Sequence, residues 1–216
     1  MNRTDVVWAV GRPTIGTAVK ALAPLRVYGA ERVPRSGGLV VAANHFSWID
    51  PPALGAACPR TLYYMAKVEA HHIPGLGQLM RSFGAFSVRR GESDREAVRT
   101  MRQIVADGHA LGLFVEGTRQ LSGVPGRVQA GAAMVAINED VPVIAAAIHG
   151  SQHWKPGNFA PVSIAWGEPM TFDGLSRGGK GYKEASTQIE RELRKLWDWL
   201  VGIHELGRPR EAIPPR

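Results

Sequence analysis

His45 and Asp50 are the pair of side chains in this chain best suited to chemistry. They lie in the segment 44–51, Asn-His-Phe-Ser-Trp-Ile-Asp-Pro, directly after a short apolar run. An imidazole with an oriented carboxylate beside it can take a proton from a hydroxyl near neutral pH. The spacing alone favours a plainer interpretation, because an aspartate followed by a proline is a good helix start and the histidine could simply occupy a turn.

Two more polar clusters follow apolar runs and change that balance. An arginine pair, 89–90, follows one run, and residues 116–119, Glu-Gly-Thr-Arg, follow another. Ligand sites in α/β sheets gather at the carboxyl ends of strands, so we expect both clusters to meet His45 in one crevice. Guanidinium groups suit phosphate because their planar fork donates two parallel hydrogen bonds. The set predicts a site for an anionic substrate that carries a hydroxyl.

The hydrophobic pattern predicts the elements that position these residues. Strands are expected at 39–43, 62–65, 111–115, 141–148 and 162–166, and helices at 93–107, 131–138 and around 189–200. This alternation is typical of an α/β fold with a mostly parallel or mixed sheet flanked by helices on both faces. We expect one domain over residues 1–216, with a loose tail at 207–216.

The composition fits a globular domain with an anionic partner. The net charge of +7 favours nucleic acid, anionic lipid or a phosphorylated substrate, although an arginine excess that only aids solubility explains it equally well. No basic stripe with interleaved aromatics is evident, which argues against nucleic acid. The single cysteine, Cys58, excludes an internal disulfide, and no histidine–carboxylate set has metal-ligand spacing. His149 and His153 are expected at the surface.

The N-terminal segment 1–25 leaves two interpretations open. It has no run of 18 apolar residues, so we expect no transmembrane helix. Its apolar residues are interrupted by Arg12-Pro13 and Lys20. The segment could be an amphipathic helix in the headgroup plane, with Trp8 as an anchor, or an N-terminal helix packed onto the domain.

Four segments, in order, resemble the motifs of the glycerolipid acyltransferases. They are His45-x4-Asp50, the block 84–90, the segment 114–119 and the stretch 141–144, and the resemblance spans about residues 28–148. It is strongest to 1-acyl-glycerol-3-phosphate acyltransferases of the bacterial PlsC type. The resemblance implies transfer of a fatty acyl group from acyl-CoA or acyl carrier protein to the free hydroxyl of 1-acyl-glycerol 3-phosphate. The product would be phosphatidic acid, in phospholipid biosynthesis.

The resemblance also implies a role for each motif residue. His45 would be the general base, and Asp50 would hold the ring's other nitrogen. The acceptor and its phosphate would be bound by Arg90, Glu116, Gly117, Thr118 and Arg119, with Glu116 orienting Arg119 or a glycerol hydroxyl. Supporting roles would fall to Asn44, to Lys67, for which a surface ion pair is an equal alternative, and to Pro142, which would shape a strand start near the thioester or have a purely structural role. No metal or cofactor is implied beyond the acyl-thioester co-substrate.

Partners and location follow from the same resemblance. The protein would bind lysophospholipid and acyl thioester, with acyl carrier protein as a candidate partner and no nucleic acid. It would lie on the cytoplasmic face of the cell membrane as a peripheral or monotopic protein attracted to anionic lipid. The family's usual proline in the third motif is Val115 here, which leaves the acceptor open. Glycerol 3-phosphate or another lysophospholipid as acceptor, or a non-catalytic lipid-binding protein, are the alternatives.

Overall fold

A seven-stranded mixed sheet forms the centre of the molecule. The computed structural model describes residues 3–67, 77–78, 81, 83–88 and 95–216. The strands are β1 (Leu25–Tyr28), β2 (Leu39–Ala43), β3 (Leu62–Lys67), β4 (Ala85–Val88), β5 (Ala110–Phe114), β6 (Val143–His149) and β7 (Val162–Met170), in the order β1-β7-β6-β2-β5-β3-β4. Strands β6, β2, β5, β3 and β4 are parallel, whereas β7 is antiparallel to β6 and carries β1 parallel to itself.

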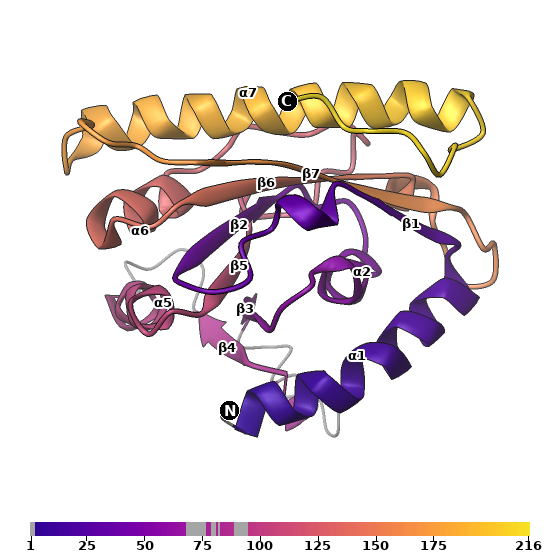
Figure 1. Cartoon of the computed structure of the whole chain (residues 1–216), viewed down its shortest axis with the longest axis horizontal. Coiled ribbons are helices and arrows are strands. Elements are labelled where there is room, and N and C mark those ends of the chain that lie inside the picture. Colours follow the sequence, from indigo (N-terminus) through magenta and orange to yellow (C-terminus); the bar gives the residue numbers. More distant parts are fainter. Residues whose placement is uncertain (1–2, 68–76, 79–80, 82, 89–94) are drawn as a thin grey trace.

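Helices cover both faces of this sheet, as predicted. The described residues form α1 (Arg3–Leu22), α2 (Asp50–Ala57), α5 (Arg95–Ala106), α6 (Gly131–Glu139) and α7 (Gly179–Glu205), with short 3-10 turns at Ala30–Arg32 and Ser151–His153. Helices α5, α6 and α7 lie on one face, and α2 lies on the other with α1 outside it (Figure 1).

The central strands are apolar because both of their faces are covered. Every residue of β2 is buried. Its alternate side chains pack into two separate cores: Val40 and Ala42 face the α5–α6–α7 layer, while Leu39, Val41 and Ala43 face α2. This double burial fixes the register of β2 between β5 and β6, and therefore fixes where His45 emerges.

Helix α1 packs onto the domain through one of its faces, as the second interpretation of the N-terminal segment expects. Trp8 is only 2% exposed, and its indole Nε1 donates a 3.0 Å hydrogen bond to the carbonyl of Phe83. Trp8 as a headgroup anchor is therefore wrong. Val6 and Val10 remain exposed on the same helix. Within the described part of the chain, no helix combines the length and apolar character needed to cross a bilayer.

The predicted loose tail at 207–216 is also wrong. Arg208 donates hydrogen bonds to the hydroxyl of Ser163 and to the carbonyls of Pro24 and Val162. Further on, the guanidinium of Arg32 binds the carbonyls of Pro214 and Pro215. Figure 1 shows the tail turning back along α7. Hydrogen bonds between arginines and main-chain carbonyls hold the tail, and its polar composition gave no sign of this.

The expectation for His149, the last residue of β6, and for His153, just beyond it, holds only in part. His153 is exposed, but His149 is half-buried with its ring against those of Trp197 and His204. Burial, together with the nearby His153, lowers the pKa of His149 to about 4.

Candidate active site

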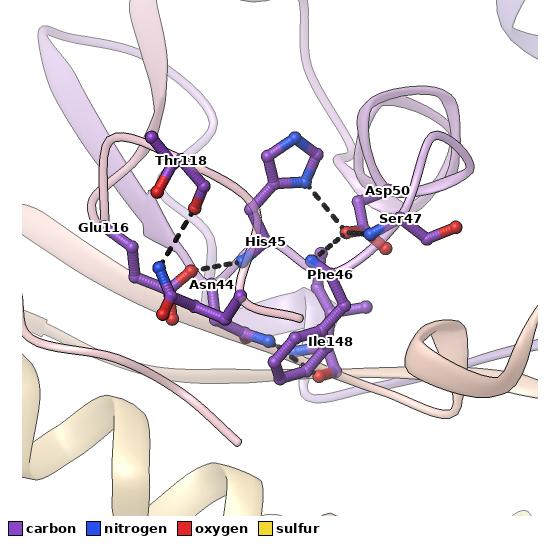
Figure 2. Close-up of polar contacts among 9 residues, drawn as sticks. Asn44, His45, Phe46, Ser47, Asp50, Glu116, Thr118 and Ile148 are labelled. Carbon is purple, nitrogen blue, oxygen red and sulfur yellow. Dashed lines mark hydrogen bonds and ion pairs between the residues drawn. The ribbon is translucent and has the colours of Figure 1, made fainter. Parts of the chain in front are cut away.

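The site lies where two neighbouring parallel strands end at the same edge of the sheet. Strand β2 pairs with β5 up to Ala43 and Phe114, and the segments 44–50 and 115–120 follow directly. Figure 2 shows His45, Asp50, Glu116 and Thr118 brought together by these two segments. The predicted convergence of the first and third motifs is thus confirmed.

Asp50 is bound to the imidazole of His45 and to the backbone of the turn between them. His45 Nδ1 lies 2.9 Å from Asp50 Oδ2, and the same oxygen accepts the main-chain N–H groups of Phe46 at 2.6 Å and Ser47 at 2.7 Å. Asp50 is fully buried. It is the first residue of α2, but its side chain reaches back into the turn instead of capping the helix ahead. These backbone hydrogen bonds therefore fix the carboxylate in the position from which it orients the imidazole.

The imidazole of His45 is held in one plane with its far nitrogen unoccupied. The Phe114 ring stacks against it at 4.1 Å between centroids, with 23° between the planes. Because an ionised carboxylate only accepts, a neutral imidazole bonded to it carries its hydrogen on Nδ1 and keeps a free lone pair on Nε2. Figure 2 shows that nitrogen pointing away from Asp50, and no described residue hydrogen-bonds to it. A side chain that is 14% exposed can accept a proton from a molecule outside.

Glu116 clamps the backbone of this site. Its Oε2 accepts the main-chain N–H of His45 at 2.8 Å, and its Oε1 accepts that of Gly126 at 2.7 Å. Burial raises the pKa of Glu116 to about 7, although both hydrogen bonds oppose the rise. The sequence interpretation had Glu116 orienting Arg119 or a glycerol hydroxyl. The structure instead occupies each of its oxygens with a backbone donor.

The turn after β5 brings Arg119 to the rim. Gly117 adopts a φ of +76°, a left-handed conformation that glycine tolerates without strain, and its N–H donates to the Phe114 carbonyl. The N–H of Gln120 then donates to the His45 carbonyl at 2.7 Å. Thr118 and Arg119 are exposed, and the guanidinium carbon of Arg119 lies 4.5 Å from the centre of the Trp48 ring.

The remaining predicted residues have different positions. Arg90 lies outside the described residues, two positions after β4. Lys67 ends β3 at the site's edge of the sheet, but its side chain lies outside the described part. Pro142 lies at the opposite edge, where its carbonyl accepts the N–H of Val40, about 20 Å along β6 from the level of His45. Pro142 therefore lies at a strand start far from His45, which fits the purely structural role.

Asn44 links the site to the next strand. Its Oδ1 accepts the N–H of Ile148 at 2.7 Å and its Nδ2 donates to the carbonyl of the same residue at 2.9 Å (Figure 2). The supporting role expected for Asn44 is thus a structural one, since the buried amide extends the β2–β6 pairing up to His45. Trp48 contacts Arg119, and Phe114 stacks on His45. Neither aromatic residue was singled out from the sequence.

Comparisons with known proteins show which family the chain belongs to. The family model described as "Acyltransferase" matches residues 24–149. The chain is 31% identical over 162 residues to the 1-acyl-sn-glycerol-3-phosphate acyltransferase of Bacillus subtilis, covering 71% of this chain and 79% of that protein. It is 35% identical over 99 residues to the lyso-ornithine lipid O-acyltransferase of Pseudomonas aeruginosa, covering 45% and 37%. The crystal structure of the 1-acyl-sn-glycerophosphate acyltransferase PlsC from Thermotoga maritima matches with a TM-score of 0.75 and 25% identity, over 95% of this chain and 82% of that one. The chain belongs to the acyltransferase family.

Proposed function

We propose that the protein transfers a fatty acyl group from an acyl thioester to the free hydroxyl of 1-acyl-glycerol 3-phosphate, forming phosphatidic acid. The observation that carries the proposal is the 2.9 Å contact between His45 Nδ1 and Asp50, with Nε2 directed away from it. The Bacillus subtilis and Thermotoga maritima relatives are named for this activity.

The geometry supports a direct transfer with His45 as the shuttle for one proton. Nε2 takes the hydroxyl proton while the oxygen attacks the thioester carbonyl, giving a tetrahedral oxyanion. Asp50 stabilises the imidazolium through Nδ1–H and keeps the ring oriented. When the intermediate collapses, the carbon–sulfur bond breaks, and the thiolate leaves and recovers the proton from Nε2. The products are the ester and the free thiol of coenzyme A or acyl carrier protein.

The single cysteine of the chain does not support a covalent thioester intermediate. Cys58 is fully buried at the far end of α2, and burial raises the pKa of its thiol. A buried thiol that resists ionisation is a poor acyl acceptor. We therefore propose a single displacement that uses the acyl thioester as co-substrate and no further cofactor.

The acceptor's phosphate would meet arginine at the rim of the site. Arg119 is exposed, and the next residue, Gln120, donates its N–H to the His45 carbonyl. This hydrogen bond keeps the Arg119 charge close to the proposed base. Arg90 is proposed as its partner from the motif resemblance. A planar guanidinium can bind two phosphate oxygens at once.

We also propose that the protein works at the cytoplasmic face of the membrane as a peripheral or monotopic protein. A net charge of +7 and the exposed Val6 and Val10 on α1 favour contact with an anionic bilayer, where a lysophospholipid resides.

A donor and acceptor panel tests the reaction. Purified protein in vesicles would receive acyl-CoA or acyl carrier protein thioester with lysophosphatidate, glycerol 3-phosphate or a neutral lysolipid, and release of thiol would be followed. We expect lysophosphatidate to give the highest kcat/KM. We expect His45→Ala to abolish transfer without loss of folded structure, and unchanged turnover in that variant would refute the mechanism.

A lyso-ornithine lipid acceptor is the second candidate, favoured by the Pseudomonas aeruginosa relative. The same panel with lyso-ornithine lipid added separates the two by their relative kcat/KM. A higher kcat/KM for lyso-ornithine lipid than for lysophosphatidate would assign the protein to that acceptor.

A further inference from the structure

An exposed tryptophan beside the proposed base carries an arginine on its ring. Trp48 is 72% exposed, an unusual position for so large an apolar side chain. The Arg119 guanidinium carbon lies 4.5 Å from the centre of its ring, within the range of a cation–π contact. In the part of the chain that the structure describes, Arg119 forms no ion pair. The Trp48 indole is thus the group that contacts the Arg119 guanidinium.

The segments that carry the two side chains are both attached to His45. Trp48 lies in the turn between His45 and Asp50, where Asp50 accepts the N–H groups of Phe46 and Ser47. Arg119 precedes Gln120, whose N–H binds the His45 carbonyl. The ring and the guanidinium therefore meet at a fixed place relative to the imidazole, although both are at the surface.

We propose that Trp48 is a positioning residue that holds the Arg119 guanidinium ready for the phosphate of the acceptor. This rests on the proposed function, because it needs an anionic acceptor. An exposed arginine otherwise samples many rotamers, and ordering it on binding costs free energy. Stacking occupies the face of the guanidinium and leaves its N–H edge available for two parallel hydrogen bonds to phosphate oxygens.

The first measurement is the kinetics of Trp48→Ala and Trp48→Phe. We expect Trp48→Ala to raise the KM for lysophosphatidate about 2- to 5-fold with little change in kcat, the factor expected for one exposed cation–π contact. Trp48→Phe keeps a ring face and should recover most of the loss. Ile213→Ala, an equally exposed apolar residue on the C-terminal tail, is the matched control and should leave KM unchanged.

The second measurement is a double-mutant cycle with Arg119→Ala. If Trp48 acts through Arg119, Trp48→Ala adds nothing to the KM of Arg119→Ala. A merely structural or lipid-contacting Trp48 would raise KM by the same factor in both backgrounds, and that result would overturn the proposal, as would an unchanged KM in the single variant. Wild-type and His45→Ala activities are measured alongside. If the proposed function is wrong, the wild type will not acylate lysophosphatidate, or His45→Ala will retain the activity. If only the Trp48 proposal is wrong, both of these controls will behave as expected and the double-mutant cycle alone will fail.

Discussion

The main-chain N–H of His45 donates a 2.8 Å hydrogen bond to the carboxylate of Glu116, a residue 71 positions later in the chain. The His45 carbonyl accepts from Gln120 in the same turn. The backbone of the proposed base is therefore held on both sides by the segment that follows β5. The site can form only when β2 and β5 pair, which makes catalytic geometry depend on correct sheet assembly.

Glu116→Gln tests the electrostatics of this clamp. Burial raises the pKa of Glu116 from 4.5 to about 7, so the folded state holds the proton more tightly than the unfolded chain. Wild-type stability should therefore fall as pH rises from about 4.5 to 7, by roughly 3 kcal/mol. Glutamine cannot ionise. Urea unfolding should show Glu116→Gln gaining stability relative to the wild type by up to that amount across this window.

The exposed Glu211 offers a matched control, because Glu211→Gln should show no such pH-dependent difference.

The same Glu116→Gln variant should lose activity at every pH. One carboxylate oxygen becomes an amino group, so either the His45 or the Gly126 N–H loses its acceptor. We expect kcat to fall about 10- to 100-fold from the displaced base. A stability difference from the wild type that is equal at pH 5 and pH 8 would contradict the raised pKa.

Asp50→Asn separates the orientation of His45 from the stabilisation of its charge. An asparagine can keep the bonds from Phe46 and Ser47 through its amide oxygen, but it brings no negative charge to the imidazolium. Its amino group would also occupy the place of Asp50 Oδ1, which is buried and has no hydrogen-bond partner. We expect kcat to fall by roughly 10³- to 10⁴-fold, as when a triad carboxylate is neutralised. Thiol release under saturating acceptor is the measurement.

A fold check accompanies Asp50→Asn, since the buried amide could also destabilise α2. Near-UV circular dichroism and the thermal midpoint are expected to remain close to those of the wild type. A fully folded Asp50→Asn with wild-type kcat would show that the carboxylate takes no part in the proton transfer.

The sequence was most informative where burial dictates the pattern. Strands apolar on both faces, such as Leu39–Ala43, were predicted because helices must cover them on each side. The four-residue β1 was not predicted, since Leu25–Tyr28 is an edge strand with mixed burial and no clear period. The position of Trp8 was also beyond reach, because an interrupted amphipathic segment looks the same whether its apolar face meets a protein or a lipid.

The site was predicted in its composition but not in its hydrogen bonding. The spacing of His45 and Asp50 and the rule of strand ends were enough to bring the motifs together. The contact of Glu116 with a backbone N–H could not be foreseen, because motif spacing shows which side chains are present and not which main-chain groups the turns direct toward them. The same holds for Trp48, whose contact with Arg119 depends on the conformation of two turns.

Asn44→Ala tests the link between β2 and β6. Removing the amide leaves both the N–H and the carbonyl of Ile148 without a partner in a buried place. We expect the free energy of unfolding to fall by about 2–4 kcal/mol and kcat to fall as well, since His45 is the next residue. Asn138→Ala is the control. Its half-buried amide pairs with the Tyr182 hydroxyl on the α6–α7 layer, so it should cost less stability and leave kcat unchanged. Stability lost without any loss of kcat in Asn44→Ala would show that the link does not position His45.

Arg32→Ala tests whether the C-terminal tail is part of the folded domain. The Arg32 side chain is 8% exposed, lies 3.2 Å from Glu168, and binds the carbonyls of Pro214 and Pro215. Its removal should lower the free energy of unfolding by about 1–3 kcal/mol and expose the last residues to carboxypeptidase, with kcat unaffected because the site lies elsewhere on the sheet. The exposed Arg210 provides the comparison, and Arg210→Ala should change neither property. Equal protease resistance in the wild type and Arg32→Ala would mean that the remaining contacts, among them those of Arg208 and the hydrogen bond from Lys195 to the Arg216 carbonyl, are enough to hold the tail.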